Sequence, residues 1–225
     1  MEKMKIKILV APSILSANQN NLAGEAKRME KAGADLLHVD VMDGRFVPRV
    51  NYSPATVKLL SKATKLPLDV HLMVFEPWKL VKEYAKAGAK RICVHAEAGS
   101  AEEILKTLKL IRASKCKAGI AIKPPTPLQA IDPRIFKHCD FLMPMSVNPG
   151  ASGQPFLQET IPKILHLQQI LSKMNLKKEL EADGGISAST AHLVTQVGVT
   201  VLVSGAGIFN AMDAKSAVMQ LKQSP

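Results

Sequence analysis

The stretch Leu36-Leu37-His38-Val39-Asp40-Val41-Met42-Asp43-Gly44 places two ionisable side chains inside an apolar run. Such a run is typical of a buried β-strand, in which residues i and i+2 lie on one face. His38 and Asp40 therefore share a face, and the aliphatic residues between them lie on the other. A buried imidazole beside a buried carboxylate is costly unless it is compensated. A divalent metal ion, or pairing of a protonated His with Asp, would compensate it.

Two further strand-like stretches end in side chains of the same kind. Leu66-Pro67-Leu68-Asp69-Val70-His71-Leu72-Met73 carries a second His–Asp alternation, and Glu179-Leu180-Glu181-Ala182-Asp183-Gly184-Gly185 ends in an acid. Eight apolar, β-branched-rich runs recur along the chain, and each is predicted to be a strand. The eight runs are Ile6–Leu15, Leu36–Met42, Leu68–Met73, Arg91–His95, Ala118–Ile122, Phe141–Val147, Glu179–Asp183 and Val199–Ser204.

The segments between these runs carry the apolar period of amphipathic helices. Helices are predicted over residues 22–32, 77–87, 101–111, 161–171, 189–197 and 213–221. Asn20 or Asn21 is available to cap the first helix, and Ser187 or Ser189 the fifth. Three of the helices end in Gly followed by the next strand, which is typical of a repeated turn from helix to strand. These glycines are Gly33, Gly88 and Gly198.

Alternating strands and helices with continuously apolar strands predict a parallel sheet. Eight such units in 225 residues, with no linker, fit one domain over residues 1–225. We therefore predict a single-domain α/β fold, the (β/α)8 TIM barrel. A doubly wound sheet is the alternative, but the GxGxxG fingerprint common in such sheets is missing. In a (β/α)8 barrel, functional residues lie at the C-terminal ends of the strands.

Composition narrows the class of protein. The chain is 47% hydrophobic and 22% charged, which is ordinary for a soluble globular domain. Its net charge of +11 comes from scattered Lys, which favours a solvated basic surface or, as the alternative, attraction of an anionic substrate. Aromatic residues make up only 4%, so nucleic-acid binding is not expected. No apolar run reaches the length of a membrane span, and we expect no membrane association.

Cysteine use and the N-terminus favour the cytoplasm. Cys93, Cys116 and Cys139 are odd in number and include no CxxC pair, so they are expected to be reduced thiols. The segment over residues 1–17 faintly resembles a signal peptide, but Lys7 and Pro12 interrupt its apolar part. We interpret it as the first strand.

In a barrel, the strand ends that carry His38, Asp40, His71 and Asp183 converge on the mouth. Two His and two Asp form a mixed N/O site suited to one divalent metal ion, namely Zn, Fe, Mn or Co. Hydrogen-bonded core histidines are the alternative. Asp69 and Asp43 are candidate supporting residues for such a site. For His95, a core histidine is the favoured interpretation, and a role in the site is the alternative.

Glycine-rich stretches follow the last three predicted strands. They are Ser146–Gln154, Gly184–Ser187 and Ser204–Gly207. Bare backbone N–H groups in such loops bind phosphate, and barrels often bind it there. The residues therefore predict a metal-assisted reaction on a small phosphorylated substrate.

Asp40 and Asp183 approach the pocket from different strands. Two carboxylates on opposite faces of one carbon can remove a proton and return one from the other side, which inverts the centre. A metal would stabilise the enediolate between those steps. A metal-bound carboxylate is a poorer base, so each Asp must use an oxygen that the metal leaves free, or loosen its ligation during turnover.

At this point the chain resembles the ribulose-phosphate 3-epimerase family. The resemblance runs from Ala11-Pro12-Ser13-Ile14-Leu15-Ser16 to Gly207-Ile208-Phe209. It is carried by His38–Gly44, Phe46–Pro48, Leu68–Met73, Met145–Gly150 and Asp183–Gly185, which together are highly specific. The resemblance implies interconversion of ribulose 5-phosphate and xylulose 5-phosphate at carbon 3, in the pentose phosphate pathway, by a homo-oligomer (a dimer or hexamer).

The resemblance also implies roles for residues. The metal ligands would be His38, Asp40, His71 and Asp183, with Asp40 and Asp183 as the acid/base pair. Ser13 and His71 would contact the sugar. Met42, Met73 and Met145 would form the apolar floor. The implied phosphate contacts are Gly150, Ala151, Ser152, Gly153, Gly184, Gly185, Gly205 and Ala206.

Four positions depart from the family pattern. Arg45 stands where His is usual, and Gly150-Ala151-Ser152-Gly153 stands where the family has Gly-Phe-Gly-Gly. Ala206 replaces a usual Ser, and Pro144 removes a ladder donor from the sixth predicted strand. None of these is one of the four expected ligands, so we expect intact chemistry and weaker phosphate binding.

Three other functions remain open on the sequence. A related ketose-phosphate 3-epimerase, for example one acting on D-allulose 6-phosphate, would use the same acid/base residues. A metal-dependent hydrolase barrel usually begins with His-x-His on its first strand, where this chain has Pro12-Ser13. A catalytically silent sugar-phosphate-binding barrel is the third, and the retained Asp pair disfavours it.

Overall fold

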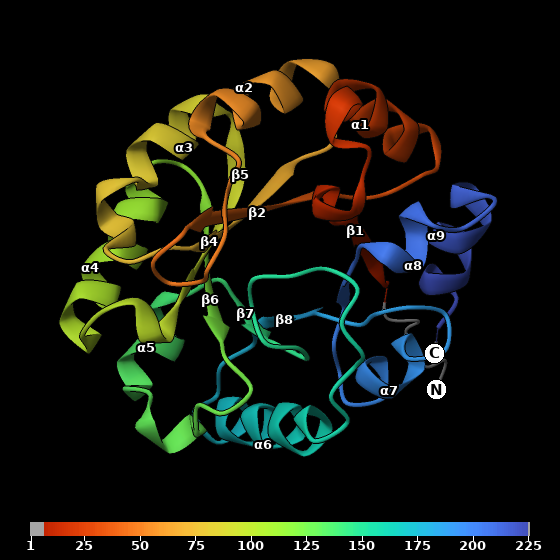
Figure 1. Cartoon of the computed structure of the whole chain (residues 1–225). Coiled ribbons are helices and arrows are strands. Elements are labelled where there is room, and N and C mark those ends of the chain that lie inside the picture. The colour runs from red at the N-terminus through yellow and green to blue at the C-terminus, as the bar shows by residue number, and fades with distance from the viewer. Residues whose placement is uncertain (1–6, 225) are drawn as a thin grey trace.

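Eight parallel strands form a barrel inside a ring of helices (Figure 1). The computed structural model describes residues 7–224, so the predicted strand residue Ile6 and the segment before it lie outside the described residues. The barrel strands are β1 (Leu9–Pro12), β2 (Leu37–Asp43), β4 (Leu68–Met73), β5 (Ala89–His95), β6 (Lys117–Ile122), β7 (Phe141–Pro144), β8 (Glu179–Asp183) and β9 (Val201–Ser204). Strand β3 (Val50–Asn51) pairs antiparallel with the end of β2.

Neighbouring strands pair in the order β1-β9-β8-β7-β6-β5-β4-β2. The seam between β1 and β2 is closed differently from the other seams. In the described part of the chain it has an isolated parallel bridge between Ser13 and His38, with Val10 O accepting from the Asp35 and Leu36 amides just before β2. The predicted (β/α)8 barrel is thereby confirmed.

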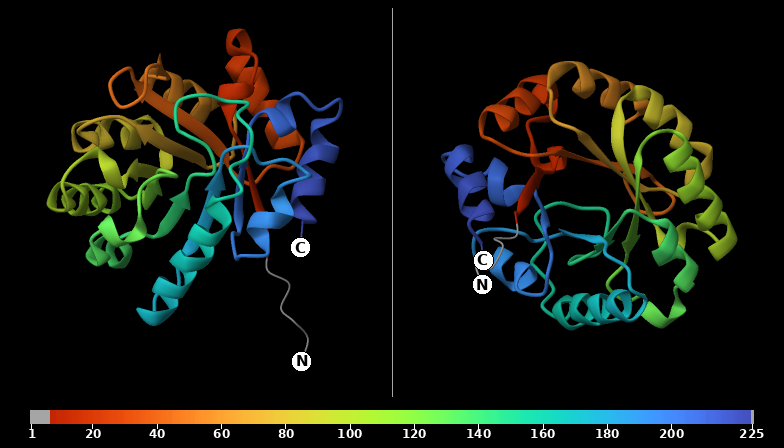
Figure 2. Two further views of the ribbon diagram at one scale, coloured as in Figure 1. Left: turned by 60° about the horizontal axis from the view of Figure 1, so that its bottom comes forward. Right: turned by 180° about the vertical axis from the view of Figure 1, so that it is seen from behind.

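Helices surround the barrel on its outer side, as the views from below and behind show (Figure 2). They are α1 (Leu22–Lys31), α2 (Pro54–Ala63), α3 (Val81–Ala87), α4 (Ala101–Ala113), α5 (Pro133–His138), α6 (Thr160–Lys173), α7 (Ala191–Thr195), α8 (Ala206–Phe209) and α9 (Ala214–Lys222). The three predicted helix-to-strand turns are confirmed, because Gly33, Gly88 and Gly198 follow their helices with positive φ.

Several predicted boundaries were wrong. The sixth predicted strand ends at Pro144, whose missing N–H cannot extend the ladder, and Met145 continues only as an isolated bridge to Asp183. Residues 77–79 form a 3₁₀ turn before α3 rather than helix. The N-cap of α7 is Thr190, so neither Ser187 nor Ser189 caps it. Asn21 caps α1, with its side chain accepting from the Gly24 amide.

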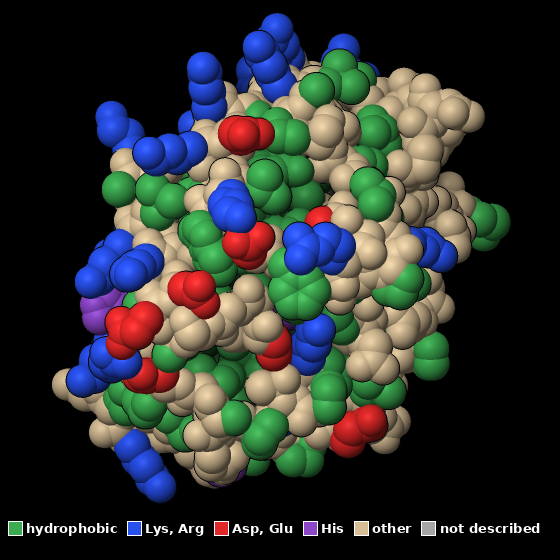
Figure 3. Space-filling model, turned by 60° about the vertical axis from the view of Figure 1, so that its left-hand side comes forward, with side chains coloured by type: hydrophobic (Ala, Val, Ile, Leu, Met, Phe, Trp, Pro, Cys, Tyr) green, Lys and Arg blue, Asp and Glu red, His purple; other side chains and the backbone are tan. Residues whose placement is uncertain are grey.

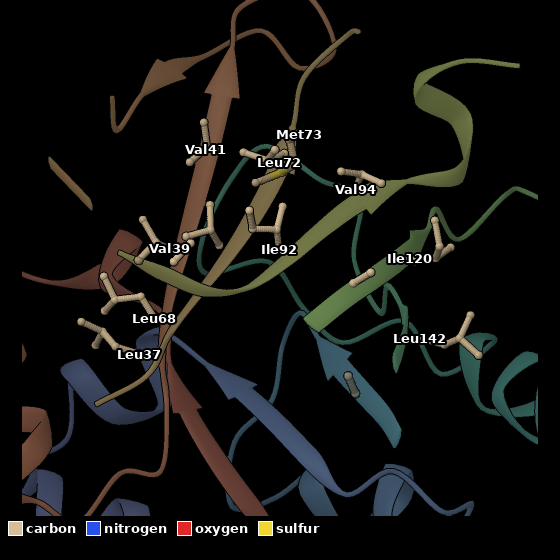
Figure 4. Packing of buried hydrophobic residues seen from close by; sticks show 14 of the residues in the cluster. Leu37, Val39, Val41, Leu68, Leu72, Met73, Ile92, Val94, Ile120 and Leu142 are labelled. Carbon is tan, nitrogen blue, oxygen red and sulfur yellow. The ribbon is translucent and has the colours of Figure 1, made fainter. Parts of the chain in front are cut away.

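The core has two layers separated by the strands. Aliphatic side chains on the outer face of the barrel pack under the helices, and those from β2, β4, β5, β6 and β7 are drawn in Figure 4. Inside the barrel, Phe141 and Met143 pack with Cys93 and Ala121. Ala11, Val201 and Val203 of β1 and β9 belong to a further small apolar cluster. The interior also holds buried polar side chains, namely His38, Asp69, His71, Arg91, His95 and Glu181.

The surface carries dispersed charges, and the helices are those of a globular fold. On the face shown in Figure 3, Lys and Arg side chains are dispersed, with Asp and Glu between them. Within residues 7–224, none of the helices has both the length and the apolar character needed to cross a membrane.

Candidate active site

The candidate site lies where β2, β4 and β8 end. Because side chains alternate along a strand, His38 and Asp40 point inward from β2, and Asp69 and His71 point inward from β4. The parallel register sets Asp40 opposite His71 and His38 opposite Asp69. Asp183 is the last residue of β8 and reaches the same point from across the barrel.

The structure brings together the four residues expected to be ligands. His38, Asp40, His71 and Asp183 each offer one ligand atom within 4.8 Å of the others. His71 Nδ1 is 3.3 Å from Asp40 Oδ1 and 3.7 Å from Asp183 Oδ2, and His38 Nε2 is 3.3 Å from the same Asp40 oxygen. We call these four residues the ligand cluster.

The ligand cluster fits a divalent metal ion. His38 Nε2 is fully buried and makes no hydrogen bond, although it faces Asp40. An orphaned buried nitrogen aimed at carboxylate oxygens costs free energy that coordination would remove. Two imidazoles and two carboxylates are the donors that Zn and the neighbouring transition metals accept.

The protein environment shifts the pKa values of the two carboxylates of the cluster in opposite directions. Burial raises the pKa of Asp183 to about 6, and the adjacent negative charge of Asp40 adds to that rise. Burial alone would also raise the pKa of Asp40, but His38 and His71 outweigh it and lower the pKa well below its usual range. Asp40 Oδ2 also accepts a 2.6 Å hydrogen bond from the Ser13 hydroxyl.

A charged network beneath the cluster holds His38. Asp69 Oδ2 lies 2.8 Å from His38 Nδ1, so Asp69 fixes which ring nitrogen of His38 faces the cluster. Arg91 donates to Asp69 Oδ1 at 3.0 Å and to Glu181 Oε2 at 2.5 Å, and also pairs with Glu179. Its guanidinium lies 3.9 Å from the centre of the Phe141 ring. Asp69 thus occupies the supporting position expected from its alternation with His71.

His95 sits against the other histidine. Its ring stacks on His71 with centroids 4.9 Å apart, and the two Nε2 atoms are 2.8 Å apart. On its other side, Nδ1 lies 3.2 Å from Glu97 Oε2. Burial lowers the pKa of His95 to about 4, although Glu97 opposes that shift. His95 therefore contacts a residue of the ligand cluster, and it is also a hydrogen-bonded core histidine.

Asp43 does not face the cluster. Its carboxylate accepts from the Arg45 and Phe46 amides in its own loop and from the Phe75 amide in the loop after β4. Asp43 therefore ties two loops of the barrel mouth together.

A cavity of about 220 Å³ opens above the cluster. Asp40 and Asp183 line it with Ser13, while His38 and His71 are buried below. The expected floor residues also line it, as do all of the expected phosphate contacts. These are Met42, Met73 and Met145, then Gly150, Ala151, Ser152, Gly153, Gly184, Gly185, Gly205 and Ala206. Their substrate roles stay predictions.

The backbone after β8 is tightly held. Gly184 and Gly185 have φ of +118° and +64°, and a Cβ on Gly185 would lie 2.6 Å from Phe156 N. Ser146 Oγ donates to the Asp183 and Gly184 carbonyls, which fixes the backbone that presents Asp183. At the mouth, Ser16 and Ser152 hydroxyls are 2.5 Å apart, so the altered Ser152 joins its loop to the loop after β1.

Sequence reasoning missed Arg91, Glu181, Glu97 and Ser146. The strand period could have indicated Glu181, which shares the inward face with Asp183, and Arg91, which shares it with His95. The Arg91–Glu181 contact joins residues 90 positions apart, and nothing in either local sequence indicates the other.

A closed parallel barrel with buried acids and imidazoles at the C-terminal ends of its strands defines an α/β-barrel enzyme. The sequence comparisons specify which one: residues 9–209 match the model of the ribulose-phosphate 3 epimerase family, and the chain belongs to that family. Members named ribulose-phosphate 3-epimerase are isomerases acting on carbohydrates, so the predicted enzyme class is confirmed.

Relatives match along almost the whole chain. Ribulose-phosphate 3-epimerase of Synechocystis sp. is 42% identical over 98% of this chain and 96% of its own length. That of Bacillus subtilis is 42% identical over 96% and 99%. The chloroplastic ribulose-5-phosphate-3-epimerase of Arabidopsis thaliana is 41% identical over 98% and 78%.

Solved structures support the fold. KGPDC from Streptococcus mutans aligns with a TM-score of 0.74 at 13% identity, covering 98% of this chain and 97% of that chain. The 3-hexulose-6-phosphate synthase from Salmonella typhimurium aligns with a TM-score of 0.66 at 15% identity, covering 97% of each chain.

Proposed function

We propose that this protein interconverts D-ribulose 5-phosphate and D-xylulose 5-phosphate by proton transfer at carbon 3 between Asp40 and Asp183. The observation that carries the proposal is that both carboxylates line one cavity from different strands, β2 and β8. One carboxylate removes the carbon-3 proton to give an enediolate, and the other delivers a proton to the opposite face. The proton count is conserved and the configuration is inverted.

The two oxygens of Asp40 have different surroundings. Oδ1 faces both imidazoles of the ligand cluster, whereas Oδ2 accepts from Ser13, a residue of the cavity wall. We therefore assign proton transfer to Oδ2 and cation binding to Oδ1. For Asp40, this division leaves one oxygen free of the metal to act as the base.

The other lining residues position the substrate. The three Met side chains form an apolar floor that excludes water from the carbanionic centre. The loops after β7, β8 and β9 line the cavity, and we assign phosphate binding to their backbone N–H groups. His38, Asp40, His71 and Asp183 would hold a divalent metal ion, which would supply positive charge to stabilise an enediolate.

We further propose that residues 1–225 act as one catalytic domain in the cytoplasm and assemble as a homo-oligomer. Three free, buried cysteines in the described chain support a reducing compartment. Val50 and Phe75, exposed apolar side chains near the mouth, support association.

Deuterium exchange tests the two-acid mechanism. In D₂O the metal-loaded parent should epimerise either substrate and incorporate deuterium at carbon 3. Asp40→Asn and Asp183→Asn keep a ligand oxygen but lose the base, so each variant should lose epimerisation by at least about 10³-fold. Each should still exchange deuterium with only one epimer, and the two variants should select opposite epimers.

Three results would contradict parts of the proposal. A parent that is inactive with every divalent metal would refute epimerase activity. Variants that exchange the same epimer would refute opposed bases. Faster turnover of D-allulose 6-phosphate than of the pentulose would replace the proposed substrate by the hexulose alternative.

A further inference from the structure

The two histidines of the ligand cluster present different ring nitrogens to its carboxylates. His38 faces them with Nε2, and its Nδ1 lies 2.8 Å from Asp69. His71 faces them with Nδ1, and its Nε2 lies 2.8 Å from His95 Nε2. A ring nitrogen binds a cation only through a free lone pair, so the proton of His71 must lie on Nε2.

Contact between two ring nitrogens requires one donor and one acceptor. His95 Nδ1 is 3.2 Å from Glu97 Oε2, and a carboxylate accepts, so that nitrogen carries a proton. A neutral His95 then accepts at Nε2, and His71 must donate from its own Nε2. The opposite arrangement would make His95 a buried imidazolium and put the His71 proton on Nδ1, facing the carboxylates.

Glu97 is held in place by the loop after β6. Its Oε1 accepts from the Lys123 amide at 2.9 Å. Lys163 of α6 donates to the carbonyls of Lys123, Pro124 and Thr126, at 2.6, 3.1 and 2.6 Å. The Glu97 carboxylate therefore has a fixed position from which it can orient the His95 ring.

Phe46 encloses the His95 ring. Its ring centroid is 4.8 Å from that of His95, and Lys123 Nζ lies 3.7 Å from the Phe46 centroid. His95 is fully buried between Phe46 and His71. Neither solvent nor free rotation can supply a different partner to its ring nitrogens.

We propose that Glu97 and His95 are positioning residues that fix the tautomer of His71, and so set the affinity of the ligand cluster for a divalent cation. The inference rests on the proposed function, because it takes His71 as a metal ligand. Glu97 would act on the cluster through two successive hydrogen bonds, as Asp69 acts on His38 through one.

The test replaces Glu97 by Gln. The Gln amide can donate to His95 Nδ1, so the proton of His95 is no longer held on Nδ1 and that of His71 is no longer held on Nε2. Co²⁺ affinity, followed by visible absorption, should fall about 10- to 100-fold in Glu97→Gln. Asp35→Asn is the matched control. Asp35 is also a partly buried carboxylate, which accepts from the Val10 amide and pairs with Lys222. It precedes the N-terminal end of β2, and neither of these partners is a residue of the cluster. Its affinity should equal that of the parent.

A second readout reports the tautomer directly. Long-range ¹H–¹⁵N spectra of metal-free parent should show His71 protonated on Nε2 and unprotonated on Nδ1, and Glu97→Gln should shift His71 toward the reverse tautomer. A purely structural role for Glu97 would not move these signals. Unchanged affinity with an unchanged tautomer in the variant would overturn the inference.

The ¹H–¹⁵N spectrum of the parent tests the proposed tautomer of His71 even if Glu97→Gln fails to fold. A proton on His71 Nδ1 in that spectrum would overturn the inference. A parent that binds no Co²⁺ would refute the metal site and the effect on affinity. If its His71 still shows the stated tautomer, the failure belongs to the proposed function and not to the hydrogen-bonded relay.

Discussion

Gly185 combines a left-handed backbone with a close approach to Phe156, and it lies in the wall of the cavity. Gly185→Ala should be destabilising because Cβ both strains φ and collides with backbone atoms. Gly33→Ala is the control, since Gly33 has φ +86° and nothing within 4 Å of an added Cβ. Gly33→Ala should cost about 1–2 kcal/mol, and Gly185→Ala about 1–3 kcal/mol more. Urea unfolding measures both, and equal losses would refute the collision.

Glu97 should make stability sensitive to acid. Burial would raise the pKa of Glu97, but hydrogen bonds from His95, Thr126 and the Lys123 amide lower it to about 2. A carboxyl group with a depressed folded-state pKa stabilises the protein above its unfolded pKa, and that stability is lost as pH falls through the folded pKa.

This loss of stability occurs between about pH 4.5 and about pH 2. The ionised Glu97 contributes at most about 3 kcal/mol to the free energy of unfolding. Glu97→Gln should therefore lose less free energy of unfolding than the parent on going from pH 7 to pH 3. Urea midpoints at several pH values measure this difference. Parallel losses in the two proteins would show that Glu97 has an ordinary pKa.

The ligand cluster and the supporting residue Asp69 could be predicted from the sequence, but the charge pairs of Arg91 could not. The period of two put His38, Asp40 and His71 on inward faces, and the barrel brought Asp183 to meet them. The stabilisation of a buried Arg91 depends on acids from β4 and β8. A local pattern carries no information about partners contributed by strands far away in sequence.

The N-terminus of α1 allows the stabilising effect of a helix cap to be compared at two adjacent residues, Asn20 and Asn21. Asn21 Oδ1 accepts from the Gly24 amide at 3.2 Å, while Asn20 is not the cap of α1. Asn21→Ala should lower the free energy of unfolding by about 1 kcal/mol. Asn20→Ala, one residue away and equally polar, should change it much less. Chemical denaturation compares the two, and equal effects would contradict the assigned cap.

Strands were predicted more closely than helices. In β4 and β8 aliphatic side chains alternate with ionisable ones, a period of two that is typical of a strand, and both strands have their predicted bounds. Helix α2 was missed although Ser53-Pro54 is a start signal, because its buried Val57 and Leu60 are too few to show a period. Helices α5 and α8 have six and four residues, which is less than the two turns a period requires.

For the whole molecule, the net charge of +11 separates two interpretations. If the basic surface attracts an anionic sugar phosphate, kcat/KM should fall by up to roughly 10-fold as salt rises from about 0.01 to 0.15 M, because screening shortens the reach of charge. The value of kcat should stay constant, since chemistry within the cavity is unaffected. Steady-state kinetics over this range measure both. A constant kcat/KM would show that the charges serve solvation alone.

The sparse pairing between β1 and β2 affects local opening of the barrel. Its bridge joins Ser13 to His38, so the seam of the wall with the sparsest pairing runs through the candidate site. A molecule that contacts both Ser13 of the β1 side and Asp40 of β2 binds across this seam. By mass action it stabilises the conformation in which β1 and β2 are paired over one in which they are separated. Occupancy of the cavity should therefore appear as slower hydrogen exchange in β1, the first strand of the barrel.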